Sequence, residues 1–200
     1  MTESTSTDLD QRIAHRVREL RAAQGFTLEQ LAARSGVSRS MISVVERGES
    51  SPTAALLDKL AAGLGVTLNA LFEAPGNTEP PSPVSRRADQ AEWQDPDSGY
   101  VRRALTPAGL SLPVQLVEVH FPPGAHVSYE AGVHRSGAHQ QVWAMSGSIL
   151  VTVGDQRHKL AAGDCLAHPI DQPISFRNPS RQAAHYLVAV ASVPFPRSTA

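Results

Sequence analysis

The stretch that decides the fold is GFTLEQLAARSGVSRSMISVVERG, residues 25–48. Within it, Thr27 and Gln30 have the spacing of a capping box, in which both side chains satisfy free backbone amides at the start of a helix. A helix is therefore expected to begin directly after Thr27. It is expected to be short, because Ser35 is followed by Gly36, and glycine readily adopts the left-handed backbone conformation that closes a helix.

A second short helix is expected after only two further residues. Ser38 is a suitable N-cap, and apolar residues at helical spacing continue to about Arg47. Two short helices joined by a tight turn that contains glycine have the form of a helix-turn-helix. In that motif the first helix crosses the phosphate backbone of DNA, and the second presents its early side chains to base edges in the major groove.

The outward positions of the second helix carry side chains that can read bases. These positions are Arg39, Ser40, Ser43 and Val44. Arginine can make a bidentate contact with guanine, serine can donate or accept at either type of base pair, and valine can meet a thymine methyl group. The alternative is a helical hairpin whose outward polar residues are simply solvated, and periodicity alone leaves both interpretations open.

Further helices are expected on both sides of this pair. Apolar residues at helical spacing predict a first helix that ends at Gly25; they are Ile13, Val17 and Leu20. Thr53 caps a fourth helix, which Gly65 ends, and Thr67 opens a last helical turn. The prediction is therefore a compact bundle of five short helices.

The wider pattern over residues 12–72 resembles the phage-repressor-like (Xre/Cro type) helix-turn-helix family. The matching segments are RVRELR at 16–21, GFTLEQLA at 25–32, GVS at 36–38, IS at 42–43, ERG at 46–48 and SPT at 51–53. The resemblance implies a lambda-repressor-like domain. It also implies that a dimer of the protein binds a two-fold symmetric operator in double-stranded DNA.

The resemblance also implies which residues touch DNA. It places contacts with phosphates or their flank at Thr27, Leu28 and Arg47, although Leu28 stands where the family often has glutamine. The second helix would supply the residues that read bases, namely Arg39, Ser40 and Ser43. Ser38, which caps this helix, is also expected among the DNA-binding residues.

An internal ion pair is a further implication of the resemblance. Arg21 and Glu46 fall where the family ties its first helix to the end of the recognition helix. If such a pair is mostly buried, loss of one partner costs about 3–5 kcal/mol, because a charge is left without its partner. These two residues are expected to be structural.

A proline-rich acidic segment separates two regions of different periodicity. The stretch 74–99 contains five prolines, and residues 73–98 hold six acidic residues against Arg86 and Arg87. Such a segment buries too little apolar surface to fold alone. The expected division is therefore a disordered start at 1–8, a helix-turn-helix domain at 9–73, a linker at 74–98 and a β domain at 99–195.

The β domain is predicted from short alternating segments with turn residues at roughly ten-residue spacing. Examples are VQLVEVHF at 114–121, QVWAM at 141–145 and ISF at 174–176. The segments HRSGAHQ at 134–140 and LAAGD at 160–164, with Pro169, Pro173 and Asn178, resemble the two motifs of a cupin. The resemblance implies a jelly-roll β-barrel, so the expected fold class is a two-domain α + β chain.

The metal site of the cupin family is not expected here. In that family two histidines two residues apart, a glutamate and a later histidine bind a divalent transition metal. Of these four positions only His134 is kept, and the others are Ser136, Gln140 and Ile174. His139 or His168 could turn toward the cavity, but scattered histidines are more often surface or hydrogen-bonded groups than ligands. We therefore expect neither a metal or other cofactor nor catalytic residues.

A barrel without a metal still offers a pocket. Strand alternation places a mixed polar and apolar set of side chains inward, which suits a small organic molecule. The expected lining residues are His134, Ser136, Gln140, Val142, Ile174 and Phe176. The alternative is a barrel filled by its own side chains that only dimerises the protein.

Composition narrows the function further. Of 200 residues 41% are hydrophobic and 18% are charged, and the formal net charge is -1, which is typical of a globular chain and not of a disordered or fibrous one. The single cysteine, Cys165, excludes an internal disulfide and a thiolate zinc cluster. No export signal or membrane-spanning stretch is apparent, so a cytoplasmic location is expected.

The sequence as a whole predicts a transcriptional regulator, a repressor by expectation, and not an enzyme. Its expected partners are an operator in double-stranded DNA, a second copy of the chain and a small-molecule effector. Two alternatives stay open. One is a metal-dependent cupin enzyme with an attached DNA-binding domain, and the other is an antitoxin-like regulator that binds a second protein.

Overall fold

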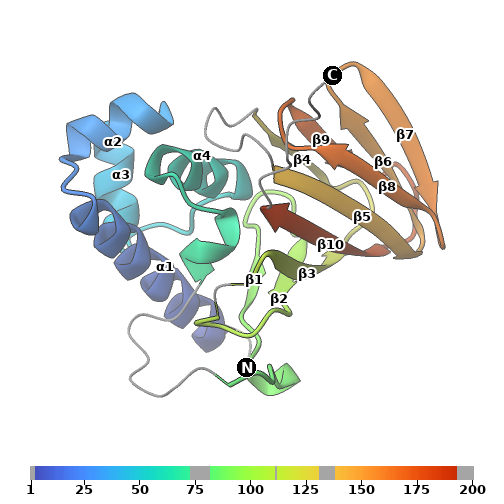
Figure 1. Cartoon of the computed structure of the whole chain (residues 1–200), viewed down its shortest axis with the longest axis horizontal. Helices are drawn as coiled ribbons and strands as arrows, with labels where there is room; N and C mark the ends of the chain where they lie inside the picture. The colour runs from blue at the N-terminus through green and yellow to red at the C-terminus, as the bar shows by residue number, and fades with distance from the viewer. Residues whose placement is uncertain (1–2, 73–81, 111, 131–137, 193–200) are drawn as a thin grey trace, which may run out of the picture.

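The computed structural model describes residues 3–72, 82–110, 112–130 and 138–192, in which helices are followed by strands (Figure 1). The helices are α1 (Glu3–Ala23), α2 (Leu28–Ser35), α3 (Arg39–Glu46), α4 (Ala54–Leu64) and the short 3₁₀ helices η1 (Leu68–Phe72) and η2 (Arg87–Asp89). None of the helices in this described part is long and apolar enough to cross a membrane.

Local capping fixes the helix-turn-helix where the sequence predicts it. Thr27 Oγ1 accepts a hydrogen bond from the Gln30 amide at 3.1 Å, and the Thr27 amide donates to Gln30 Oε1 at 2.8 Å. Gly36 closes α2 with a φ of 68°, a value that costs glycine little because it has no Cβ. Ser38 then caps α3 by accepting from the Met41 amide at 3.2 Å.

The helical domain differs from the prediction at both ends. It has four α-helices, not five, because the last element, η1, is a single 3₁₀ turn in which the Ala70 amide bonds to Thr67 three residues back. The first helix begins at Glu3, so most of the segment 1–8 that we expected to be disordered is helical. Leu9 is buried and anchors α1 at this point.

The β domain consists of two antiparallel sheets. The strands are β1 (Glu92–Gln94), β2 (Val101–Ala104), β3 (Val114–Phe121), β4 (His126–Tyr129), β5 (Ala138–Ser146), β6 (Ser148–Val153), β7 (Gln156–Ala161), β8 (Cys165–Pro169), β9 (Ile174–Arg177) and β10 (Ala184–Ser192). Their order is β1-β2-β3-β10-β5-β8 in the larger sheet and β4-β9-β6-β7 in the smaller. Among the described strands no ladder joins the edges of the two sheets, so the fold is a cupin-like sandwich and not the closed barrel that we expected.

The prediction of a linker over residues 74–98 is wrong for the second half of that segment, which contains a short helix and a strand. Residues 92–94 form β1 and pair with β2, and η2 precedes them, whereas residues 74–81 lie outside the described part of the chain. The reason is the burial of Trp93, whose ring lies 5.7 Å from Phe72 and 5.8 Å from Tyr100 between ring centroids. A large aromatic surface of this kind stabilises a strand that composition alone would not predict.

The helical domain packs against the β domain through α4 and η1 (Figure 1). Asp95 is buried, and its Oδ1 accepts from the Ala54 amide at the start of α4 at 2.8 Å, while its Oδ2 accepts from the Ser98 amide at 2.8 Å. At the other side of the contact Lys59 pairs with Glu130 at 2.9 Å. Helix α4 therefore packs against α2 within the helical domain and against β4 of the β domain.

Candidate functional site

The exposed face of α3 carries the first candidate site. Arg39 is the first residue of α3, and its side chain is 67% exposed. Its Nε lies 3.0 Å from Glu29 Oε1 on α2, and the Arg39 charge contributes to the lowered pKa of Glu29, although the larger cause is a backbone hydrogen bond. Exposed ion pairs are weak, so the Arg39 guanidinium can leave Glu29 and bond to another acceptor.

The two serines lie on the same helix, and Arg47 lies at its end. Ser40 is exposed, and its Oγ lies 3.1 Å from that of Ser38. Arg47 donates to Ser43 Oγ and pairs with Glu49, with Nε to Oε1 at 2.6 Å and Nη2 to Oε2 at 2.7 Å. The hydrogen bond with Glu49 raises the pKa of Arg47, so the guanidinium is a permanent cation at the surface.

The start of α2 holds the remaining predicted contacts. Thr27 is exposed but uses its hydroxyl to cap the helix. Leu28 is half-buried and packs against the hydrophobic core, so its side chain offers no polar group to a phosphate. Thr27 and the Arg47 charge are therefore the groups of this surface that suit a phosphate, and Leu28 supports the core.

An ion pair inside the domain holds this surface in place. Arg21 Nε and Nη2 lie 2.6 Å and 2.7 Å from the two carboxylate oxygens of Glu46, and the side chains are only 17% and 8% exposed. Arg21 also donates to the Phe26 carbonyl oxygen at 2.9 Å. The hydrogen bond with Glu46 raises the pKa of Arg21. The pair joins α1 to the end of α3, which is the structural role that the sequence predicts for it.

The second candidate site is a cavity of about 360 Å³ between the two domains. One side is formed by α4 and η1, and the other by the inner faces of both sheets. Of the predicted lining residues, Gln140, Ile174 and Phe176 line it. Val142 lies on the same face of β5 but is fully buried in the core beyond the cavity, and His134 and Ser136 lie outside the described residues.

The histidines considered as substitutes do not line this cavity. His139 and His168 are both absent from its lining residues. His168 is buried and donates from Nδ1 to the Pro169 carbonyl oxygen at 2.8 Å, while its Nε2 has no partner. Burial lowers the pKa of His168, so the ring is expected to be neutral near pH 7. Its lone pair lies in the core and not in the cavity.

Several lining residues were missed by the sequence reasoning. The most notable are Tyr100, Arg102, Gln115, Tyr129 and Tyr186. The segment before residue 114 shows no clear alternation that would identify β2, so no local signal distinguishes Arg102 as a lining residue.

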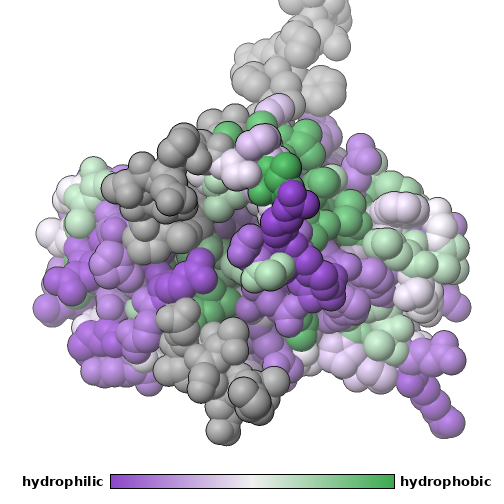
Figure 2. Space-filling model, turned by 90° about the horizontal axis from the view of Figure 1, so that it is seen from below, coloured by the Kyte–Doolittle hydropathy of each residue, from purple (hydrophilic) through white to green (hydrophobic). Residues whose placement is uncertain are grey.

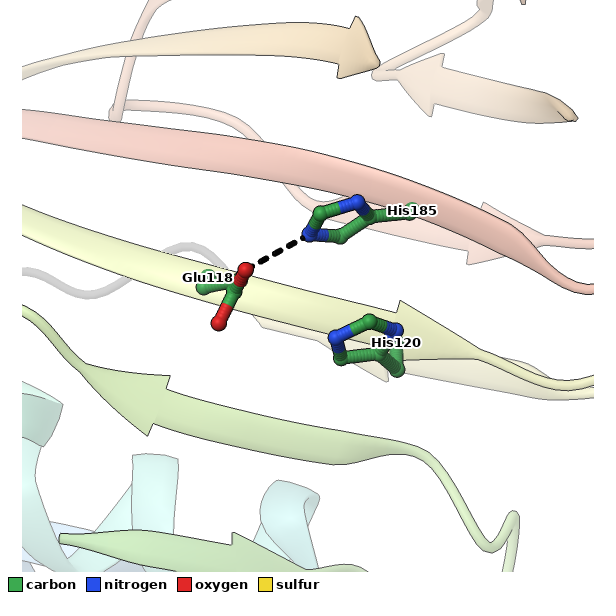
Figure 3. A group of neighbouring side chains, drawn as sticks. All are labelled: Glu118, His120 and His185. Carbon is green, nitrogen blue, oxygen red and sulfur yellow. Dashed lines mark hydrogen bonds and ion pairs between the residues drawn. The ribbon is translucent and has the colours of Figure 1, made fainter. Parts of the chain in front are cut away.

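A third group of polar side chains lies on the outer face of the larger sheet (Figure 3). Glu118 and His120 of β3 and His185 of β10 have ligand atoms within 4.8 Å of one another. His185 Nε2 lies 2.9 Å from Glu118 Oε1, and Arg103 donates to Glu118 Oε2 at 2.7 Å. Burial opposes the charge of Glu118, but these two partners lower its pKa overall.

This outer cluster is better suited to joining strands than to binding a metal ion. The rings of His120 and His185 are parallel to within 6°, with centroids 4.3 Å apart. A metal ion bound by two imidazoles lies near the plane of each ring, and two parallel planes share no such point. With both carboxylate oxygens of Glu118 already engaged, the cluster links β2, β3 and β10.

Comparisons with known proteins agree with this architecture. The helix-turn-helix (HTH_3) family model matches residues 17–71, and the cupin (Cupin_2) domain model matches residues 117–190. The chain is 27% identical to the HTH-type transcriptional regulator SutR of Escherichia coli (strain K12), over 91% of this chain and 94% of that protein. It is 32% identical to the HTH-type transcriptional regulator SinR of Bacillus subtilis (strain 168), over 47% and 78%.

A solved structure extends the similarity to both domains. The crystal structure of an HTH_3 family transcriptional regulator from Vibrio cholerae superposes with a TM-score of 0.75 at 26% identity, covering 96% of this chain and 99% of that one. Together with the capped α2–α3 pair, these matches confirm the two resemblances seen in the sequence. The chain belongs to the helix-turn-helix family of DNA-binding transcriptional regulators and carries a cupin domain after its DNA-binding domain.

Proposed function

We propose that this regulator is a sequence-specific repressor that binds DNA as a homodimer and responds to a small molecule. The observation that carries the proposal is the surface of α3, where Arg39 and Ser40 are exposed at the start of a helix held rigidly by Arg21 and Glu46. Arg39 is suited to a bidentate contact with guanine in the major groove. Arg47 and Thr27 flank it and are suited to the phosphates on either side.

The outer face of the larger sheet supports dimer formation. It exposes an outer apolar patch, which we define as Leu112, Val114, Leu116, Trp143 and Met145, with each side chain 37–46% exposed. Leu116 and Trp143 lie on β3 and β5, on either side of β10. Figure 2 shows that exposed hydrophobic surface gathers over the strand-bearing half of the molecule, while the helical half is mostly hydrophilic on this face.

Such a patch favours a self-complementary contact between two copies. A dimer formed there would carry two copies of α3, as a two-fold operator requires. The half-sites are then expected about 34 Å apart, one turn of the duplex, because both helices must enter successive major grooves on one face.

The cavity is proposed to bind an effector rather than to perform catalysis. Its volume of about 360 Å³ lies in the range of small-molecule sites. The described residues that line it include no histidine, and a catalytic metal needs more than the carboxylates of Asp58 and Glu130. We place the protein in the cytoplasm because that is where a bacterial-type regulator meets its operator.

Selection of bound duplexes from a random pool, by the full-length protein at moderate ionic strength, tests the proposal. We expect an enriched site with two inverted half-sites whose centres are separated by about one helical turn. Sedimentation of the Trp143→Glu variant tests the dimer: we expect a monomer that binds the selected site more weakly. An enriched sequence without inverted symmetry, or a Trp143→Glu variant that stays dimeric, would contradict the proposed assembly.

A further inference from the structure

The cavity between the domains is lined by a buried arginine that forms no ion pair within the described part of the chain. Arg102 of β2 lines the cavity and is only 8% exposed. Its Nη2 donates to Asn69 Oδ1, and its guanidinium carbon lies 4.7 Å above the ring of Phe72. Arg102 has no place among the ion pairs of the described residues, although burying a charge outside an ion pair is costly.

The next residue of β2, Arg103, is an arginine that does form ion pairs. Arg103 points to the opposite face, where Nε bonds to Glu92 Oε2 at 2.9 Å and Nη1 to Glu118 Oε2 at 2.7 Å. The two arginines are equally buried, at 8% and 9% exposure. They differ in their surroundings: Arg103 bonds to two carboxylates, whereas Arg102 lines the cavity.

The other residues that line the cavity indicate which groups would contact the rest of a ligand. The hydroxyls of Tyr100 and Tyr129 lie 3.0 Å apart, and burial raises the pKa of both, so they stay neutral and can donate hydrogen bonds. Tyr186 stacks on Phe176 at 5.8 Å between ring centroids. Glu130, which follows β4, is already paired with Lys59 of α4. The walls thus offer the Arg102 guanidinium, neutral hydroxyl groups and aromatic rings, together with the buried carboxylate of Asp58 on α4.

We propose that the cavity binds a small carboxylic acid with an apolar or aromatic body, and that Arg102 holds its carboxylate. The guanidinium presents two parallel N–H donors that match a carboxylate in geometry and charge. The tyrosine hydroxyls lie where they can bond to the same ligand, and the aromatic rings cover its body. This inference names the ligand class for the effector site of the proposed function and rests on it.

Arg102 also lies at the contact between the two domains. Asn69 of η1 accepts from Arg102 through Oδ1 and donates through Nδ2 to Gln115 Oε1 at 3.0 Å, while Thr67 donates to the same oxygen at 3.1 Å. A carboxylate on Arg102 competes with Asn69 for the guanidinium. The ligand would thereby alter the link between η1 and the β domain, and through linkage the affinity for the operator.

The test measures ligand binding without DNA, by calorimetry and thermal shift on the full chain. The probes are acetate, butyrate, benzoate and phenylacetate, with benzamide and benzylamine as neutral and cationic counterparts of benzoate. We expect at least one apolar carboxylate to bind and to raise the melting temperature, and benzamide and benzylamine to bind more weakly. Failure of every carboxylate, or equal binding of the amide or the amine, would overturn the proposal.

Variants connect the binding to Arg102. Arg102→Lys keeps the charge but loses the two-pronged geometry, and Arg102→Met loses both; we expect carboxylate affinity to fall by about 10- to 100-fold in the second and by less in the first. Arg157→Met, on exposed β7, is the control and should bind as the parent does. Circular dichroism and affinity for the selected duplex without probe show that each variant is folded. Unchanged carboxylate binding by Arg102→Met would refute the assignment, whereas loss of duplex binding by the parent protein would refute only the proposed function.

Discussion

Arg21 of the helical domain and Arg102 of the β domain are two arginines of low exposure with opposite surroundings. Arg21 is 17% exposed and meets both oxygens of Glu46, whereas Arg102 is 8% exposed and meets an amide and an aromatic ring. A buried charge with its partner fixes one geometry, and here it fixes α1 against the end of α3. A buried charge without a partner leaves room for an external anion. The comparison contrasts the surface of α3, which the Arg21–Glu46 pair holds in place, with the cavity that we propose binds a ligand.

The largest expected effect is the loss of stability when Arg21 loses its partner Glu46. Glu46→Ala leaves the Arg21 charge largely buried, so we expect the free energy of unfolding to fall by about 3–5 kcal/mol. Urea denaturation of the variant measures the loss. Glu49→Ala, which removes the partner of exposed Arg47, is the matched control and should change stability little. Equal losses in the two variants would show that the Arg21–Glu46 pair is no more important than a surface pair.

A smaller effect is expected on the DNA-reading face. Arg39→Ala removes an exposed side chain whose ion pair with Glu29 is also exposed, so stability should be unchanged. Affinity for the selected duplex should fall by about 1–3 kcal/mol at one base pair in each half-site, and the base preference there should relax. Arg47→Ala should instead weaken binding to all sequences alike. Fluorescence anisotropy with single-base variants of the duplex distinguishes the two patterns, and unaltered base preference in Arg39→Ala would reject it as a reader.

Removal of Arg102 is expected to change stability far less than removal of the partner of Arg21. Arg102→Met removes one hydrogen bond and one ring contact but also removes the cost of burying the charge. The two effects oppose each other, so the free energy of unfolding should change by no more than about 1 kcal/mol in either direction. A loss as large as that of Glu46→Ala in the same urea titration would mean that Arg102 is a structural residue like Arg21.

The smallest expected effect is a difference in how the melting temperatures of a His168 variant and of the parent depend on pH. Burial lowers the pKa of His168 in the β domain, so the unfolded chain binds a proton there more readily than the folded chain does. Stability contributed by the neutral ring is therefore present above the unfolded pKa of about 6.5 and is lost as the pH falls through the folded pKa. Melting temperatures between pH 7.5 and 5.5 should fall less for His168→Gln than for the parent. Identical slopes would show that protonation of His168 is not what destabilises the fold in acid.

The sequence predicted the DNA-reading half well because its signals are local. The capping residues Thr27 and Ser38 and the closing Gly36 each act within a few residues, and they appear in the structure as expected. The cavity was predicted only in part, because its walls come from residues far apart in the chain. Strand alternation found Gln140 and Ile174, but Arg102 faces the cavity only because β2 pairs with β3, a long-range contact that no local pattern encodes. The strand that contains Trp93 was not predicted for the same reason, since Phe72, one of the rings that Trp93 contacts, lies in the helical domain.

The central claim is that α3 reads bases through the side chains at its start. Methylation interference on the selected duplex tests it most directly, because methylation of guanine N7 blocks the acceptor that an arginine uses in the major groove. The account predicts that methylation of one guanine in each half-site prevents binding by the parent protein and that Arg39→Ala no longer responds to that methyl group. An interference pattern that is the same for both proteins would contradict it.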